Sequence, residues 1–277
     1  MSLFDAFRFD GKRALVVGGA TGMGAAAAEV VRDAGAEVVV MDFADVTLDG
    51  VKAIHVNLAE RASIDAAFAE IGGPIDALLS CAGVADGTPG IEKINYVGHR
   101  YLIDKLLAGG LLPRGSAIGL ISSAAGLGWE SNLPELKEWL DIDDFDAAAK
   151  WAHDHEKADY FHSKQAICAY VATRAMPLLK QGIRINAICP GPTDTPLARA
   201  NAEMWLGFGA DYREEIGIKA STPLEQAYPL VFLCSDAAAG IAGVTLITDA
   251  GYFAAGITEV FPPATPTVNF LRGKFDV

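Results

Sequence analysis

The segment RALVVGGATGMGAAAAEVVRDA, residues 13–34, decides the fold class of this chain. Its first five residues, an arginine followed by four apolar residues, predict a short strand. A glycine-rich turn follows, and the alanine-rich stretch from Gly24 to Ala34 predicts a helix. Further strands are expected at 37–41, 53–56, 75–80, 116–121, 184–188 and 245–248, and a further helix at 63–71. This alternation predicts a doubly wound α/β layer fold with a parallel sheet, whose strands from residue 75 onward are covered on both faces.

The composition predicts a single domain that spans residues 1–277. With 51% hydrophobic residues the chain can bury a large core, and no linker or repeat divides it. No stretch reaches the roughly 18 uncharged apolar residues of a membrane span, and no export signal is recognisable, so a soluble cytoplasmic protein is expected. The net charge of −13 disfavours a nucleic acid or an anionic membrane as a partner and favours a small neutral molecule. The cysteines lack metal-ligand spacing and are expected to be reduced and buried: Cys81, Cys168, Cys189 and Cys234.

The segment 129–159 interrupts the alternation and is strongly acidic, with ten carboxylates against three lysines. Two short amphipathic helices are predicted in it, because apolar residues recur at helical spacing at Leu133, Leu136, Trp139 and Leu140 and again at Ala147, Ala148 and Trp151. The aspartates between residues 141 and 146 lack the glycine and the late glutamate of a calcium loop, and His153 with His155 lacks a thiol partner. No metal site is therefore predicted.

The glycines after the first strand predict a nucleotide site. Glycine lets the backbone approach a pyrophosphate, and the N-terminus of the next helix faces the anion. Asp42 ends the second strand about twenty residues later, and this combination predicts an adenine dinucleotide. The Asp42 carboxylate can accept hydrogen bonds from both ribose hydroxyls but would repel a 2'-phosphate, for which Thr21, Phe43 and Ala44 offer no cation. We therefore predict NAD rather than NADP as the cofactor.

Tyr160 and Lys164 are the strongest catalytic candidates. Their four-residue spacing on a helix places a phenol and an ammonium group on one face. A free tyrosine, with a pKa of about 10, is a poor base at neutral pH, and a neighbouring lysine cation favours the phenolate. The same spacing is common on solvated helices, so the assignment depends on the rest of the chain.

Taken together, these motifs resemble those of the short-chain dehydrogenase/reductase family over Lys12 to Tyr252. The resemblance rests on the turn from Val17 to Gly24, Ser80-Cys81-Ala82-Gly83, Asn95, Ser122-Ser123-Ala124-Ala125-Gly126, Tyr160 with Lys164, and Pro190-Gly191-Pro192-Thr193-Asp194-Thr195. The long segment before Tyr160 makes the chain most similar to the 3α-hydroxysteroid dehydrogenase/carbonyl reductase branch. The resemblance implies a Rossmann-type domain that transfers hydride between NAD and an alcohol or ketone.

The resemblance also implies a role for each site residue. Tyr160 is the expected acid/base, Lys164 lowers its pKa and holds the nicotinamide ribose, Ser123 polarises the carbonyl, and Asn95 fixes a water in a proton relay. Thr195 is expected to bond the nicotinamide carboxamide. The expected cofactor contacts are Gly18, Ala20, Thr21, Gly22, Met23, Gly24, Asp42, Asn57, Leu58, Cys81, Ala82, Gly83, Tyr160, Lys164, Pro190, Gly191, Thr193 and Thr195.

The chain departs from the family pattern in several places. The departures are Val17 for a usual Thr, Asn57 for the Asp that meets the adenine amine, Ser80-Cys81 for Asn-Asn, and 249–251 without a second Gly. In addition, 36 residues separate Ser123 from Tyr160, so the two side chains meet only if the acidic insertion loops out.

The segment 193–221 corresponds to the substrate-covering loop of the family. Its apolar residues Met204, Trp205, Leu206, Phe208 and Tyr212 are interrupted by Gly207 and Gly209 and lack helical spacing, which favours a lid over plain core. Ser123, Trp205 and Phe208 are the predicted substrate contacts. The expected substrate is a bulky apolar alcohol or ketone, such as a steroid, terpenoid or aryl compound. The tail 253–277 could close this pocket or bind a neighbouring subunit.

Two other functions fit parts of the pattern. A non-catalytic dinucleotide-sensing protein could keep the fold, although the intact set of Asn95, Ser123, Tyr160 and Lys164 argues against it. A methyltransferase also uses a glycine-rich turn and an acidic strand end, but it has no use for Tyr160 and Lys164. For assembly, the resemblance implies association through the helices that carry Asn95 and Tyr160. We expect the acidic insertion to obstruct one interface and favour a homodimer over a tetramer.

Overall fold

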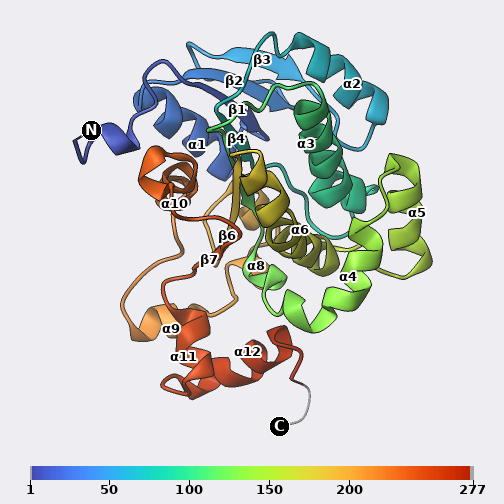
Figure 1. Ribbon diagram of the computed structural model, residues 1–277. Helices are drawn as coiled ribbons and strands as arrows, with labels where there is room; N and C mark the ends of the chain where they lie inside the picture. The colour runs from blue at the N-terminus through green and yellow to red at the C-terminus, as the bar shows by residue number, and fades with distance from the viewer. Residues whose placement is uncertain (1, 275–277) are drawn as a thin grey trace.

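A parallel sheet forms the centre of the molecule (Figure 1). The computed structural model describes residues 2–274, and the strands in this range are β1 (Arg13–Val17), β2 (Glu37–Asp42), β3 (Lys52–His55), β4 (Ala77–Ser80), β5 (Ala117–Ile121), β6 (Arg184–Pro190) and β7 (Thr245–Thr248). They pair in the order β3-β2-β1-β4-β5-β6-β7, which confirms the doubly wound fold. Since the order reverses between β1 and β4, a ligand crevice is expected there, beyond the carboxyl ends of the strands.

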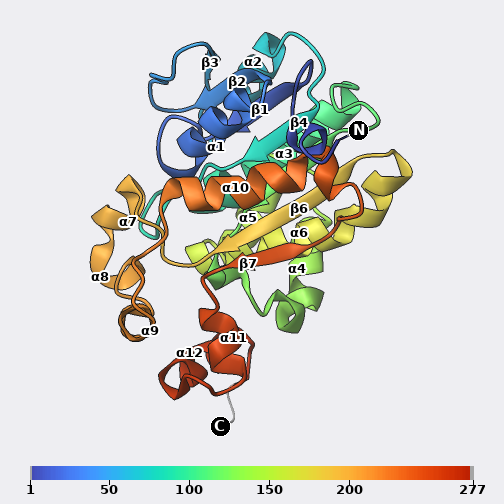
Figure 2. The ribbon, with the colours of Figure 1, turned by 90° about the vertical axis from the view of Figure 1, so that its left-hand side faces the viewer.

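Helices cover both faces of the sheet. They are α1 (Gly22–Asp33), α2 (Arg61–Glu70), α3 (Gly98–Ala108), α6 (Tyr160–Lys180) and α10 (Pro223–Cys234). Figure 2 shows α1 and α10 side by side on one face, where Val31 and Leu230 are buried in the same apolar core. On the opposite face α2, α3 and α6 cover a larger core that includes Leu15 and Ile118. The central strand β5 is buried along its whole length and consists of apolar residues and one glycine, because both of its faces are covered.

The acidic insertion folds into α4 (Leu133–Leu140) and α5 (Phe145–Asp154), as its periodicity predicts. Both helices lie on the outer side of α3 and α6 (Figure 1). Trp139 is fully buried in this contact, and its ring centroid lies 4.9 Å from that of Tyr96. The guanidinium group of Arg100 donates hydrogen bonds of 2.6 and 3.0 Å to backbone carbonyls in the connection between α4 and α5. The insertion therefore covers part of the α3 and α6 surface.

Short helices follow the last two strands. They are α7 (Pro196–Ala200), α8 (Ala202–Trp205) and α9 (Ala210–Glu215) after β6, and α11 (Tyr252–Ile257) and α12 (Thr265–Leu271) after β7 (Figure 2). Met204 and Trp205 belong to α8 and Tyr212 to α9, although the spacing of these apolar residues is not helical, and Gly207 and Gly209 lie between the two helices. The lid stays a prediction. Residues 275–277 of the predicted tail lie outside the described residues.

Two further expectations concern the burial of β7 and of the cysteines, and a third concerns membrane-spanning helices. Burial on both faces is wrong for β7, which among the described residues is an edge strand paired only with β6 and exposes 37% of Ile247. The cysteines are free thiols, as expected, but Cys81 is only half-buried because it lines the crevice. Within residues 2–274, no helix has both the length and the apolar character needed to cross a membrane.

Candidate active site

A close contact between two turns forms the base of the crevice. Gly18 has a φ of +83°, and a Cβ atom on it would lie 2.4 Å from the backbone of Ala82, so only glycine fits. The carbonyl oxygen of Val17 accepts hydrogen bonds from the backbone N–H groups of Cys81 (2.8 Å) and Ala82 (2.9 Å). The first turn of α1 also lines the crevice, and its N–H groups without intrahelical partners suit an anion.

A groove of about 520 Å³ at this junction collects most of the predicted cofactor contacts. Its walls include Gly18, Thr21, Gly22, Met23, Gly24, Asp42, Asn57, Leu58, Cys81, Ala82, Gly83 and Thr195. The predicted contact Ala20 is not among its lining residues. Phe43 and Thr88 do line the groove but are not among the predicted contacts, because neither residue type is characteristic of a nucleotide site. The Asn57 side-chain oxygen accepts a hydrogen bond from the N–H of Ala59 (3.0 Å), so it is shared with a local turn. Glycine walls, a helix N-terminus and a strand-end carboxylate fit an adenine dinucleotide.

Asp42 is fixed by the backbone at the end of β2. One carboxylate oxygen accepts a hydrogen bond from the N–H of Ala44 (2.9 Å), and the other accepts one from the N–H of Ala20 (2.8 Å). Each oxygen keeps a lone pair for another donor. Among the described residues that line the groove there is no Lys or Arg, and Arg13 is engaged with Glu37 at 2.8 Å. The groove thus presents a negative charge where a ribose 2'-substituent would lie in this fold.

A second cavity, of about 280 Å³, adjoins the groove and contains the catalytic candidates. The two spaces share wall residues, including Met23, Cys81, Gly83, Thr195 and Leu197. Ser123, Tyr160 and Lys164 line the cavity together with the predicted contacts Pro190, Gly191 and Thr193. The hydroxyl group of Ser123 lies near enough to that of Tyr160 to lower the Tyr160 pKa. The two side chains meet across 36 intervening residues because the insertion packs outside α6 rather than between them.

Burial is the largest influence on the ionisation of Tyr160 and Lys164. Burial raises the pKa of Tyr160 to about 12, the hydrogen bond with Ser123 lowers it, and the Asp86 charge raises it. Burial also lowers the pKa of Lys164 to about 8. The Lys164 Nζ atom lies 5.5 Å from the centre of the Tyr160 ring and donates a 3.1 Å hydrogen bond to the carbonyl of Ile121. The expectation of a lowered Tyr160 pKa is therefore corrected for this structure, because burial outweighs the hydrogen bond with Ser123, which is the contact that lowers this pKa.

Asn95 lies directly behind the loop that follows β4. Its side chain is fully buried in a wider helical turn, Lys93–Val97, that precedes α3. The amide oxygen accepts a hydrogen bond from the N–H of Val84 (2.8 Å), and the amide nitrogen donates to the carbonyl of the same residue (3.0 Å). A Cβ atom on Gly83 would lie 3.5 Å from this oxygen and 3.3 Å from the Lys164 Nζ atom. Asn95 and Lys164 thus flank one glycine, and the water relay stays a prediction.

The outer wall of the cavity is apolar and comes from two distant segments. Trp205 and Phe208, the predicted substrate contacts, line it, and their contact with a substrate stays a prediction. Leu271 of α12 lines it as well, so the tail closes the pocket of its own chain. The α12 backbone packs so closely on Gly128 that a Cβ there would lie 1.7 Å from the Leu271 oxygen. Sequence reasoning missed Leu271, and only its three-residue spacing from Val268, also buried, marks the inner face of this helix.

Comparisons with known proteins find relatives that match most of the chain. A family model described as enoyl-(acyl carrier protein) reductase matches residues 145–253. The chain is 28% identical to a coniferyl-alcohol dehydrogenase of Pseudomonas sp. over 87% of this chain and 96% of that protein. It is 30% identical to a cis-4-hydroxycyclohexanecarboxylate dehydrogenase of Sinomonas cyclohexanicum, over 87% and 96%. A crystal structure of the 3α-hydroxysteroid dehydrogenase of Pseudomonas sp. B-0831, complexed with NADH, superposes with a TM-score of 0.72 at 25% identity, covering 90% of this chain and 99% of that chain.

Proposed function

We propose that this chain, which belongs to the short-chain dehydrogenase/reductase family, interconverts a secondary alcohol and a ketone with NAD. The relatives named above are dehydrogenases of hydroxyl compounds. The observation that carries this proposal is the position of Ser123, Tyr160 and Lys164. All three line the cavity that adjoins the dinucleotide-shaped groove. A substrate oxygen in that cavity can therefore reach a proton donor and a second hydroxyl next to the cofactor.

The residues of the chain account for the proton transfer. NAD supplies the hydride acceptor or, when reduced, the hydride. In the reduction direction, Tyr160 with its raised pKa stays protonated at neutral pH and gives its proton to the substrate oxygen as negative charge develops there. Ser123 donates a hydrogen bond to the same oxygen and adds no charge of its own. In the oxidation direction, the phenolate must accept the hydroxyl proton, so alkaline conditions favour this direction.

The choice of NAD is supported by Asp42. Both oxygens of this carboxylate are already oriented by backbone N–H groups and retain lone pairs for ribose hydroxyls. A 2'-phosphate placed beside Asp42 would meet charge repulsion, and the groove lining in the described chain has no cation to offset it. The two backbone hydrogen bonds also reduce the freedom of the side chain to turn away.

The substrate is proposed to be bulky, apolar and uncharged. Apart from Lys164, whose Nζ atom is directed to a backbone carbonyl, the described residues that line the cavity carry no charged side chain. Trp205, Phe208 and Leu271 supply an apolar wall. Burial of an unpaired carboxylate against such a wall would be unfavourable, whereas an apolar ring gains from leaving water. Steroid, terpenoid and aryl alcohols are the candidate classes.

The test is a panel of neutral hydroxysteroids, terpenols and aryl alcohols, assayed for formation of the reduced cofactor with NAD and with NADP. We expect turnover with NAD for at least one cyclic secondary alcohol, with the corresponding ketone as product. A matched carboxylated analogue of the best substrate should be turned over poorly. Tight NAD binding without turnover of any compound in either direction would favour the dinucleotide-sensing alternative instead.

A further inference from the structure

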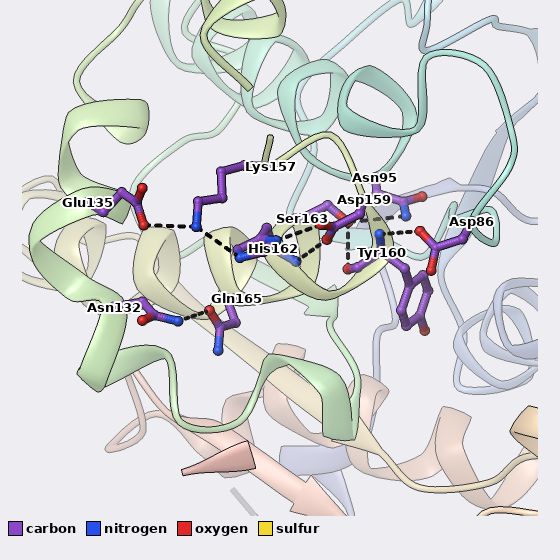
Figure 3. A network of polar contacts seen from close by, with 10 residues as sticks. All are labelled: Asp86, Asn95, Asn132, Glu135, Lys157, Asp159, Tyr160, His162, Ser163 and Gln165. Atoms are coloured by element: carbon purple, nitrogen blue, oxygen red, sulfur yellow. Dashed lines mark hydrogen bonds and ion pairs between the residues drawn. The ribbon is translucent and has the colours of Figure 1, made fainter. Parts of the chain in front are cut away.

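The first turn of α6 depends on a distant loop for one of its hydrogen bonds. Tyr160 is the first residue of α6, where backbone N–H groups have no acceptor within the helix. The side chain of the preceding residue, Asp159, accepts a hydrogen bond from the N–H of His162 (2.8 Å) and not from the N–H of Tyr160. The Tyr160 N–H donates instead to the carboxylate of Asp86, at 2.7 Å and 74 positions away (Figure 3).

The loop that carries Asp86 is itself anchored. Val84 forms two hydrogen bonds with the buried side chain of Asn95, and Ala85 is buried. Val84 also lines the cofactor groove, whereas Asp86 is exposed and is among the lining residues of neither the groove nor the cavity. Asp86 is therefore in a position to act on Tyr160 without touching a cofactor or substrate.

We propose that Asp86 is a positioning residue, whose carboxylate ties the start of α6, and with it Tyr160, to the loop between β4 and Asn95. This inference rests on the proposed function of Tyr160 and adds a residue that the family motifs do not contain. A carboxylate at a helix N-terminus is favoured by the helix dipole, so the contact stabilises the first turn as well as orienting it. Movement of Tyr160 by a fraction of an ångström would change the approach of its hydroxyl to the substrate oxygen.

The charge of Asp86 gives this role an electrostatic signature. The groups that face Tyr160 are Lys164 from α6, Ser123 from the turn after β5, Cys189 from β6, and Asp86 from the loop after β4. The nearby polar chain of Glu135, Lys157, His162 and Asp159 lies along the α6 N-terminus (Figure 3). Asp86 adds negative charge near the phenol and opposes its ionisation, so neutralising Asp86 should favour the phenolate.

Two substitutions separate the hydrogen bond from the charge. Asp86→Asn keeps an acceptor oxygen for the Tyr160 N–H and removes the charge, whereas Asp86→Ala removes both. Glu29→Gln, at an exposed position of α1, controls for a lost negative charge elsewhere. For alcohol oxidation, Asp86→Asn should move the ascending limb of the pH profile of kcat/KM to lower pH and leave the maximal kcat within about threefold. Asp86→Ala should show the same pH shift and a kcat lower by roughly tenfold, with unchanged NAD affinity.

Amide hydrogen exchange at Tyr160 tests the contact without any turnover. Exchange at this amide should be accelerated in Asp86→Ala, be intermediate in Asp86→Asn and be unchanged in Glu29→Gln. If the Asp86→Ala variant shows the same Tyr160 amide exchange, the same kcat and the same pH profile as the wild-type protein, the positioning role is overturned. If the wild-type protein lacks turnover while Asp86 still protects this amide, the proposed function fails and the structural tie stands. If the Asp86→Ala variant is unstable, the Asp86→Asn variant tests the proposal: a shifted pH profile and faster Tyr160 amide exchange support the positioning role, and wild-type values of both overturn it.

Discussion

The indole ring of Trp205 lies over the phenol ring of Tyr160, with ring centroids 4.9 Å apart and an interplanar angle of 45°. This contact joins the segment after β6 to the first turn of α6. It also restricts the access of water to the phenol, and burial is the main cause of the raised Tyr160 pKa. Trp205 can therefore serve both as a wall for the substrate and as part of the environment that sets the protonation of Tyr160.

Trp205→Ala should raise the KM for a bulky apolar substrate by about tenfold or more, because a large apolar contact is lost. The dissociation constant for NAD should change little. Better hydration of the phenol should also shift the oxidation profile to lower pH. Tyr228→Ala, at an exposed aromatic position on α10, provides the control. An unchanged KM across the whole substrate panel would show that the substrate does not contact Trp205.

The second prediction concerns the effect of Asp42 on the choice between NAD and NADP. The wild-type protein should prefer NAD to NADP, and Asp42→Ala should erode the preference by weakening NAD and relieving repulsion of the phosphate. Asp42→Asn should give an intermediate result, because it keeps one acceptor oxygen. Dissociation constants for both cofactors, measured at one ionic strength, check this order. Equal use of NAD and NADP by the wild-type protein would contradict the role given to Asp42.

Lys164 should reduce the stability of the cofactor-free protein at neutral pH. Its pKa falls from 10.5 when exposed to about 8 when folded, so below pH 8 the full cost of burying the cation is present. Between about pH 8 and 10.5 the unfolded chain binds more protons at this site, and stability from this group rises with pH. Lys164→Met should therefore be more stable than wild type at pH 7, by up to roughly 3 kcal/mol.

Denaturant unfolding at pH 7 and pH 10 checks this prediction, with Lys180→Met at an exposed position as control. The advantage of Lys164→Met should shrink at pH 10, where the folded protein holds Lys164 mostly neutral. An advantage that is equal at the two pH values would indicate a packing effect. A variant less stable than wild type at pH 7 would contradict the assigned burial cost.

The insertion should limit assembly through α3 and α6. Trp139 is buried against Tyr96, and Arg100 is 2% exposed because the α4 to α5 connection covers it. We propose a homodimer for the intact protein and expect light scattering at low salt to give its mass. Deletion of residues 132–156 should uncover the helix surface and produce larger assemblies. A stable tetramer that dissociates on this deletion would show that the insertion builds the interface.

Much of the fold could be predicted because local chemistry determines it. The apolar run 14–17 fits a strand buried on both faces, and the spacing of Leu136 and Trp139 fits the inner face of a helix. Edge position could not be predicted, since Leu246 and Ile247 are adjacent apolar residues, as in a strand covered on both faces, while only β6 pairs with this strand among the described residues. Composition reports what a segment can bury, and the tertiary structure decides which segments are buried.

In the candidate site, too, local features could be predicted from the sequence and long-range contacts could not. The glycine turn, Asp42 and the Tyr160 to Lys164 spacing are short motifs with a local geometric reason, and they were found. The bond from Asp86 to Tyr160 and the docking of Leu271 on the cavity join segments far apart in the chain and carry no motif. The direction of the Tyr160 pKa shift depends on burial, which only the packed structure defines.

The most direct test of the account is hydride transfer by Tyr160→Phe, measured as NADH formation in a single turnover with the best alcohol of the panel. The substitution removes only the ionisable oxygen, so NAD affinity and the free energy of unfolding should stay close to wild type. The rate should fall by about a hundredfold or more, the usual contribution of a positioned acid/base. A variant that binds NAD normally and keeps more than about a tenth of the wild-type rate would contradict proton transfer by Tyr160.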